Sequence, residues 1–529
     1  MKRLIFFTAV IVNILSACNN ETGGVTQNES RDNSVTTTNS YSELFFDSSA
    51  LDKFIQQEKL HDSLTSRIKS FYNGRNYEYA WFFKEGIANY ASAFINLVDD
   101  YISYSGDSVI DNPSLRQWVD SFSEEEKFNV SDPNVLRTEF LLTTQFFRYA
   151  YRAYQGRNRL NAEQLEWYIP TKKIDLVALL DSVVRNKGRN VTAQVNRQYG
   201  LLKIFLLKYD SLGKKGGWPA IDVDKKTYKP GDTSKTISQV KKRLFLEGDF
   251  NTNDTTNEFT LALTDGINNF QRRYGLKQDG IINSSLISEM NRPIEQRIRQ
   301  MLINMERIRW VPAEPTMDFL LVNIPEFRLH VYEKGNYQWS MNIVVGSTSH
   351  NTVIFTGTLK YIVFSPYWNV PPSIYKKEIL PAMQRNKNYL AKHNMERYGN
   401  GVRQKPGPNN SLGLVKFLFP NSHNIYLHDT PSKSLFGETR RAFSHGCIRL
   451  SEPVRLARFL LRNDNDWDSL KIAKAMNAGK EKYVIVNETV PVYIGYFTAW
   501  VDREGQINFR NDIYGHDQKM AARMFSEKQ

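Results

Sequence analysis

The amino-acid sequence predicts a multidomain α+β protein with an all-helical N-terminal scaffold, a small three-helix domain, and a mainly antiparallel β domain that carries an inserted helical lid. Three observations predict this class. The chain has 529 residues, enough for three or four domains at roughly 150 residues each. Its 41% hydrophobic and 24% charged content is typical of a folded globular protein. Apolar residues follow a helical period over residues 46–212, whereas from Met317 on they alternate with polar residues.

The first 17 residues are typical of a short secretory signal. Lys2 and Arg3 precede an apolar run that closes at Ala17 and Cys18 and is too short to span a bilayer stably. The segment resembles a bacterial lipoprotein signal, which implies cleavage before Cys18 and lipidation of that residue. The resemblance also implies a periplasmic protein anchored by lipid to a cell-envelope membrane, and Asn19 favours the outer membrane over the inner one.

Residues 18–45 are rich in Asn, Ser and Thr and have few large apolar groups, so we expect a flexible tether. The following segment, 46–212, has apolar residues at helical spacing and is predicted to be a helical scaffold domain whose aromatic residues form its core. A stretch rich in glycine, 213–219, ends it.

A smaller unit is predicted at 225–293. Phe270-Gln271, Gly275 and Gly280 resemble the three-helix peptidoglycan-binding repeat found beside many cell-wall enzymes. Physically, Phe270 is a core residue and the two glycines supply turn conformations, so the motif indicates a fold and leaves open whether the unit contacts glycan. Residues 294–316 are expected to form a helical linker.

The β domain is predicted to span 317–485. Every second residue of one segment belongs to an apolar series, formed by Leu320, Val322 and Ile324. This alternation is typical of a strand with one buried face. A proline pair opens a helical stretch inside this domain, and the insertion at 371–410 is interpreted as a lid because long insertions are often functional. Residues 486–529 form a C-terminal extension.

Cysteine usage points to a reactive group. Cys18 and Cys447 are the only cysteines, so a lipidated Cys18 would leave Cys447 as a lone thiol outside the cytoplasm, which is either a nucleophile or an inert buried thiol. A cysteine nucleophile needs a base, a group that orients the base, and oxyanion donors. His428 is the candidate base, with a main-chain carbonyl near Asp429 holding its second ring nitrogen. The turn through Gly446 would expose the N–H groups of Gly446 and Cys447, and the sulfur is expected to be ionised beside the imidazole.

His428 and the later run Ser444-His445-Gly446-Cys447-Ile448-Arg449 resemble the L,D-transpeptidase family with the YkuD catalytic domain. Residues 365–372 and 404–410 resemble its large Gram-negative subgroup, which combines a helical scaffold, a peptidoglycan-binding repeat and an inserted lid. The resemblance implies that Cys447 is acylated by a tetrapeptide stem with release of D-Ala. A diaminopimelate side-chain amine of another stem then resolves the thioester, which gives a 3→3 cross-link.

The same resemblance implies that peptidoglycan stem peptides are both donor and acceptor, that carbapenems form thioesters with the enzyme, and that no cofactor or metal is needed. Its products serve cell-wall biogenesis, remodelling and cell shape. Water as acceptor would make the enzyme an L,D-carboxypeptidase, and a free D-amino acid would make it an exchange enzyme. A non-catalytic wall-binding lipoprotein is the alternative from another class.

Each accompanying residue has two interpretations. His445 and Ser444 either take part in the reaction or only brace the turn, and bracing is favoured for His445. Arg449 either binds a stem carboxylate or ties the loop to an acidic neighbour. Tyr426 and Trp368 either line the donor groove or are packing residues of a β face.

Three rival site chemistries fit the sequence less well, among them a NlpC-type cysteine peptidase, whose cysteine would precede its histidine. His423, His428, His445 and Cys447 lie close enough in sequence to suggest zinc, but they lack the usual Cys-x-x-Cys spacing. Ser373 and Lys376 match Ser-x-x-Lys of serine penicillin-binding enzymes without its companion motifs. The net charge of +13 is spread along the chain, so no nucleic-acid partner is expected. The sequence leaves the oligomeric state open.

Overall fold

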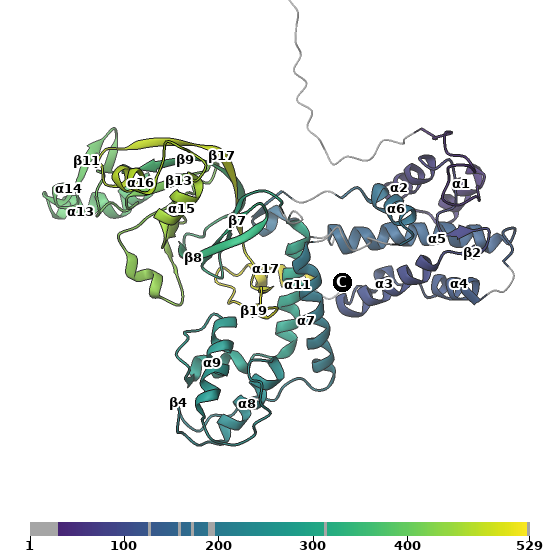
Figure 1. The fold of residues 1–529 in the computed structure, drawn as a ribbon, viewed down its shortest axis with the longest axis horizontal. Coiled ribbons are helices and arrows are strands. Elements are labelled where there is room, and N and C mark those ends of the chain that lie inside the picture. Colours follow the sequence, from purple (N-terminus) through teal and green to yellow (C-terminus); the bar gives the residue numbers. More distant parts are fainter. Residues whose placement is uncertain are drawn as a thin grey trace, which may run out of the picture. The chain divides into compact units, whose positions relative to one another are not determined.

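The computed structural model describes residues 30–124, 128–156, 160–170, 174–188, 196–311 and 315–525 (Figure 1). The predicted signal at 1–17 and the lipidation site Cys18 lie outside these residues. Helices dominate 48–310 and strands dominate the region after 317, which confirms the predicted α+β class. Among the described helices, none has both the length and the apolar character needed to cross a membrane.

The chain folds into two compact units. Of the described residues, one unit combines 30–99, 109–124, 128–149 and 175–188, and the other combines 100–108, 150–156, 160–170, Ile174, 196–311 and 315–525. The first unit holds most of the helices α1 (Ser48–Gln57), α2 (Asp62–Asn73), α3 (Asn89–Ser105), α4 (Pro113–Glu124), α5 (Pro133–Ala150) and α6 (Leu176–Arg185), and the short strands β1 (Phe82–Phe83) and β2 (Gly86–Ile87).

The first unit has an aromatic core, as the sequence predicts, with Phe71, Trp81 and Phe140 buried. A buried carboxylate ties its parts together, because Glu139 accepts hydrogen bonds from the backbone N–H groups of Ala80 (2.7 Å) and Trp81 (2.9 Å). These bonds satisfy a buried carboxyl group whose pKa burial raises to about 7.

Residues 30–45 of the predicted tether differ from the expectation. They lie against the first unit: Ser42 is buried and its hydroxyl donates to the Phe82 carbonyl at 2.7 Å, and Phe45 forms a β-bridge with Glu78. Polar composition suggested a free segment, but side-chain hydroxyls that find backbone acceptors hold this one in place.

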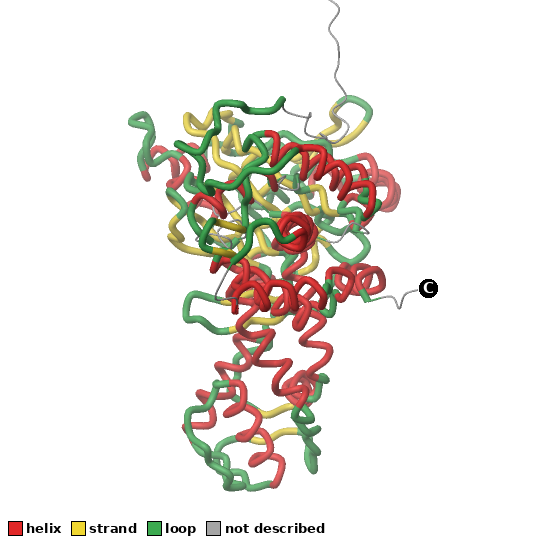
Figure 2. Tube along the Cα trace, turned by 90° about the vertical axis from the view of Figure 1, so that its right-hand side faces the viewer, coloured by secondary structure: helices red, strands yellow, loops and turns green. Residues whose placement is uncertain are grey.

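The second unit begins with two long helices, α7 (Arg197–Lys214) and α11 (Ile294–Trp310), which pack against each other. Between them in sequence, residues 225–293 form three helices, α8 (Lys235–Glu247), α9 (Leu261–Arg273) and α10 (Ser284–Met290), with the strand pair β4 (Thr227–Tyr228) and β5 (Ile282–Asn283). Phe270 is fully buried and stacks on Tyr274 at 4.0 Å, and Gly275 and Gly280 have φ of +65° and +64°. This region is mostly helical, whereas the long strands of the unit lie in a separate body rich in strands (Figure 2).

That body is a ten-stranded sheet. Nine of its strands follow the order β13-β14-β16-β8-β7-β6-β17-β9-β3, and the tenth, β15, pairs in parallel with β8. A further pairing of β13 with β9 closes the sheet on itself. Most neighbours are antiparallel, whereas β14 with β16, β6 with β17, and β3 with β9 are parallel. The strands are β3 (Trp167–Tyr168), β6 (Phe319–Asn323), β7 (Arg328–Glu333), β8 (Asn336–Gly346), β9 (Ile354–Phe364), β13 (Val415–Leu418), β14 (Leu427–His428), β15 (Ala442–Ser444), β16 (Ile448–Leu450) and β17 (Lys482–Gly495).

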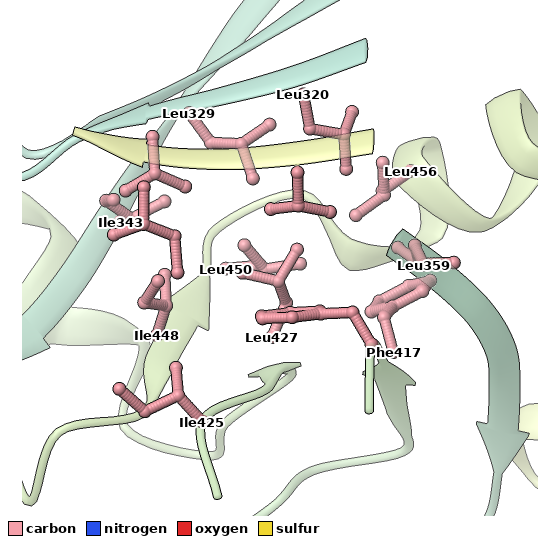
Figure 3. Close-up of a cluster of buried hydrophobic side chains, with 14 of the residues drawn as sticks. Leu320, Leu329, Ile343, Leu359, Phe417, Ile425, Leu427, Ile448, Leu450 and Leu456 are labelled. Atoms are coloured by element: carbon pink, nitrogen blue, oxygen red, sulfur yellow. The ribbon is translucent and has the colours of Figure 1, made fainter. Parts of the chain in front are cut away.

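Alternating side chains fill the inside of this sheet, among them Leu320, Ile343, Leu427 and Ile448 (Figure 3). Helices α15 (Pro453–Leu460) and α16 (Ser469–Met476) contribute further apolar residues. Side chains alternate between the two faces of a strand, so the residues next to the buried ones on β14 and β16 face the candidate site.

Two predicted boundaries differ from the structure. Strand β3 comes from the segment assigned to the helical scaffold, and its buried Trp167 packs on Trp310 at 5.6 Å. Strand β17 runs through the predicted boundary at 485, so the extension proper begins after Gly495, with β18 (Ala499–Val501), β19 (Ile507–Phe509) and α17 (His516–Met524). Periodicity reports local structure and not which core a segment joins.

The insertion has a small core of its own, formed by Val370, Ile379 and Val402. It contains the expected helices, α12 (Pro372–Ile374), a π-helical turn Tyr375–Ile379, α13 (Leu380–Arg385) and α14 (Tyr389–Lys392). It also contains a three-stranded sheet that the sequence analysis missed, made of β10 (Trp368–Asn369), β11 (Met395–Tyr398) and β12 (Gly401–Gln404).

Candidate active site

Cys447 lies in the tight turn between β15 and β16. The turn needs glycine at position 446, where φ is +111°. Ser444 shapes it from within: its hydroxyl donates to the Cys447 carbonyl (2.5 Å) and accepts from the Gly446 N–H (3.1 Å). Ser444 therefore braces the turn. The Gly446 N–H, expected as an oxyanion donor, is already used by Ser444.

His428 ends β14, which pairs in parallel with β16 in the register Leu427 to Ile448 and His428 to Arg449. This pairing places His428 and Cys447 on neighbouring segments. The imidazole is 4% exposed, and its Nδ1 lies 2.5 Å from the Asp429 carbonyl oxygen. Nδ1 therefore donates to that carbonyl, which leaves Nε2 as the proton acceptor.

The Asp429 carboxylate supports the same corner. It accepts from the Leu414 N–H at 2.9 Å and pairs with Lys433. Gly413 leaves room for it, because a Cβ at that position would lie 2.3 Å from the carboxylate oxygen. Asp429 thus orients His428 through its main chain, while its side chain holds the loop.

The electrostatics favour a neutral pair at rest. Burial, aided by the nearby Arg449, lowers the pKa of His428 from 6.5 to about 4. Burial raises the pKa of the Cys447 thiol, which donates to the Asn424 carbonyl oxygen at 3.7 Å. Desolvation penalises both charged forms, so the electrostatics disfavour the ion pair that the sequence predicts for the resting site.

Arg449 and Tyr426 flank the thiol. The Arg449 Nε is buried and has no hydrogen-bond partner within the described chain, and burial lowers the pKa of this guanidinium. Tyr426 interacts with Cys447, and its ring centroid lies 5.7 Å from that of His428. Trp368, by contrast, packs against the small core of the insertion.

His445 connects the turn to the insertion. Its Nε2 lies 3.2 Å from the Glu378 carboxylate of the π-helical turn, and its ring lies 4.9 Å from that of His350. The side chain is about half exposed (47%). These contacts agree with a bracing role, and they bring the insertion next to Cys447.

Two residues that sequence reasoning missed hold the turn from behind. Buried Thr352 donates to the Gly446 carbonyl (2.8 Å) and accepts from the Gly346 N–H (2.9 Å). Tyr514, from the C-terminal extension, donates to the Gly346 carbonyl at 2.6 Å. A single threonine and a distant tyrosine carry no local sequence signal for this role.

Comparison with known families assigns the domain. The model of the L,D-transpeptidase catalytic domain (YkuD) matches residues 317–494, and a scaffold-domain model matches residues 66–206. Residues 317–494 are an L,D-transpeptidase catalytic domain. This family is an enzyme class that cross-links peptidoglycan, and the match confirms the predicted family.

A curated relative, a putative L,D-transpeptidase of Haemophilus influenzae, is 32% identical over 251 residues, which is 43% of this chain and 50% of the relative. The chain thus spans about half the length of this relative. Solved L,D-transpeptidases are also similar: that of Stackebrandtia nassauensis (15% identity, 53% of this chain, 97% of that chain, TM-score 0.22) and residues 123–326 of that of Xylanimonas cellulosilytica (14%, 52%, 100%, 0.19). A third was solved in complex with imipenem (13%, 34%, 58%, 0.18).

The rival sites are not assembled in the L,D-transpeptidase domain. Across the described residues, no three His, Cys, Asp or Glu side chains are grouped so that they could hold a metal ion. His423 instead packs on Phe355, with ring centroids 4.9 Å apart. Ser373 and Lys376 are both exposed on the insertion.

Proposed function

We propose that this protein is a cysteine-dependent peptidoglycan L,D-transpeptidase that forms 3→3 cross-links. The proposal rests on one observation above all: β14 and β16 place His428 and Cys447 on neighbouring segments, with Nδ1 of His428 bound to the Asp429 carbonyl. The remaining nitrogen, Nε2, is then free to take a proton from the nucleophile.

The first half-reaction begins from the neutral pair. As Sγ attacks the carbonyl between diaminopimelate and the terminal D-Ala, Nε2 of His428 takes the thiol proton. The Asp429 carbonyl stabilises the imidazolium that forms. Collapse of the tetrahedral intermediate breaks the amide bond, His428 returns the proton to the leaving amine, and D-Ala departs from a thioester on Cys447.

The second half-reaction reverses these roles. The side-chain amine of a diaminopimelate on another stem attacks the thioester and gives a proton to His428. The carbon–sulfur bond breaks and the thiol is restored. We assign oxyanion stabilisation to the Cys447 N–H, because the Gly446 N–H is bound to Ser444.

Arg449 is proposed to bind the donor stem. Its buried and unpartnered Nε is costly unless a ligand supplies an acceptor, and a carboxylate matches a guanidinium in both charge and shape. Tyr426, which flanks the thiol, is proposed to line the donor groove, whereas Trp368 packs within the insertion. The insertion covers the site through the contact of Glu378 with His445.

The proposal includes a place in the cell. The segment before residue 19 supports export and lipidation at Cys18, with anchoring to a periplasmic membrane surface, and Asn19 favours the outer membrane over the inner one. Replacing Cys18 by Ala should release the protein from the membrane fraction. Retention of that variant in membranes would contradict the anchor.

The decisive experiment mixes purified protein with tetrapeptide muropeptides and follows products by mass spectrometry. We expect D-Ala release, a covalent acyl adduct on Cys447, and cross-linked dimers, all abolished in Cys447→Ala. Tripeptides without dimers would identify a carboxypeptidase, and stems carrying a new D-amino acid would identify exchange. An unchanged muropeptide profile would support the non-catalytic wall-binding alternative and refute the proposal.

A further inference from the structure

A cleft of about 1740 Å³ opens in the second unit, apart from Cys447 and His428. Its walls include the turn between β6 and β7, parts of β7 and β8, residues 436–441 before β15, the end of α9 with the residues that follow it to 278, the start of α7, and the hairpin β18–β19 with its flanks. The volume exceeds the roughly 300–1,000 Å³ of common small-molecule pockets, so the cleft has room for a segment of a polymer.

Several arginines line this cleft, and three of them, Arg328, Arg441 and Arg510, have no carboxylate within ion-pair distance among the described residues. Arg328 donates to the Ser340 hydroxyl (2.6 Å) and to Asn342 (3.3 Å). Arg441 donates to backbone carbonyls, the shortest contact being 2.7 Å, and Arg510 donates to two more at 2.7 Å. Neutral oxygen atoms therefore accept the hydrogen bonds of each guanidinium. No carboxylate among the described residues forms an ion pair with these three side chains.

The one carboxylate that all three share electrostatically is Glu326. It is already bound by His330, with 2.9 Å between Nε2 and Oε2. Burial opposes its ionisation, yet His330 and the arginines lower the pKa of Glu326 to about 2. Although Glu438, Asp502, Glu504 and Asp512 also line the cleft, Glu326 is the carboxylate that interacts with these arginines, and it faces more positive charge than it can neutralise.

The charged forms of Arg441 and Arg510 are destabilised in this cleft. Burial, with repulsion from Arg328, lowers the pKa of Arg441 to about 10, and burial likewise lowers the pKa of Arg510 to about 10. The Nδ1 of His330 is buried without a partner among the described residues. Charges and donors that lack partners in a concave, partly dry surface attract anions.

We propose that this cleft binds a carboxylate-bearing stem peptide of a peptidoglycan strand, other than the stem being processed at Cys447. This inference rests on the proposed function. Guanidinium groups recognise carboxylates through paired hydrogen bonds, and the cleft can hold several such groups along a peptide. Arg441 lies at the end of the wall that continues through β15 to Ser444, so a strand held here is anchored beside the segment that carries the nucleophile.

The test measures binding to protein whose active site is blocked. The full chain is first acylated on Cys447 with a carbapenem, and binding of a soluble disaccharide tetrapeptide is then followed by calorimetry. We expect binding to weaken at least tenfold in Arg328→Gln, to be largely retained in Arg328→Lys, and to weaken with added salt. Arg455→Gln, which removes an exposed charge outside the cleft, is the matched control and should bind as the wild type does.

The outcomes separate the two proposals. Normal acylation together with muropeptide binding that Arg328→Gln leaves unchanged would overturn the cleft proposal alone. If neither the wild type nor any variant is acylated by the carbapenem, the proposed function is overturned. The cleft proposal is then tested separately, by comparing binding of the disaccharide tetrapeptide to unblocked Arg328→Gln and Arg455→Gln. Inorganic phosphate that binds the cleft as tightly as the muropeptide, with the same dependence on Arg328, would show a phosphate site and overturn the assignment to carboxylates.

Discussion

Replacing Arg449 by Gln should raise the pKa of His428 and move the acid limb of Cys447 acylation to higher pH. Burial and the Arg449 charge together lower the pKa of His428 from 6.5 to about 4. This lowering of the His428 pKa by about 2.5 corresponds to a free energy of ~3 kcal/mol that favours the neutral imidazole over the charged one. At pH 6 the native site would then hold the proton on only about 1% of molecules, so the base is available well below neutral pH.

The assay is the second-order rate of carbapenem acylation, read by mass spectrometry between about pH 4 and about pH 7, where the base titrates. We expect the wild-type rate to fall only near pH 4. In Arg449→Gln the limb should lie higher but still below 6.5, because burial remains the larger cause. Arg449→Lys keeps the charge and should stay near the wild type.

Two results would refute this reasoning. A wild-type acid limb near pH 6.5 would mean that burial does not control His428. Strong thiolate absorbance in the ultraviolet at neutral pH, lost in Cys447→Ser, would mean that the resting pair is ionised despite the raised pKa of the thiol. Measuring the same limb in Arg455→Gln controls for a general change in surface charge.

Three other substitutions test the supports of the site. Thr352→Val keeps the shape but leaves the Gly446 carbonyl without its donor, which should cost ~1–3 kcal/mol in thermal unfolding and slow acylation. Gly413→Ala should lower both stability and activity, because its Cβ would meet a carboxylate at 2.3 Å and the φ of +61° disfavours a side chain by about 1 kcal/mol more. Glu378→Gln removes an exposed pair with His445 worth ~0–1 kcal/mol, so muropeptide turnover should change severalfold at most while carbapenem acylation holds.

Each of these expectations has a contrary result. Native-like melting and acylation in Thr352→Val would show that the turn holds itself. Full activity in Gly413→Ala would mean that the loop moves aside at little cost. A larger loss of carbapenem acylation than of muropeptide turnover in Glu378→Gln would make the insertion a support of the nucleophile and not a cover for the substrate.

Much of the fold follows from local patterns. The change from helical to alternating periodicity predicted a β domain from Met317, and the family match begins at the same residue. The run around Cys447, together with His428, predicted which family the domain belongs to. Such patterns are readable because backbone conformation and motif chemistry depend on residues that are close together in sequence.

The tertiary structure decided the rest. Strand β3 joins the sheet of the β domain from a segment whose periodicity indicated a helical scaffold. Thr352 reaches the turn at Gly446 from a distant part of the chain, and Tyr514 in turn holds Thr352 and Gly346.

The protonation of Cys447 and His428, and the unpaired charges of the arginine-lined cleft, also depend on burial. Sequence alone thus determined the residue types and their local order. Which groups are removed from water, and which distant groups face them, is determined only when separate segments pack together, because desolvation and charge interactions act through space and not along the chain.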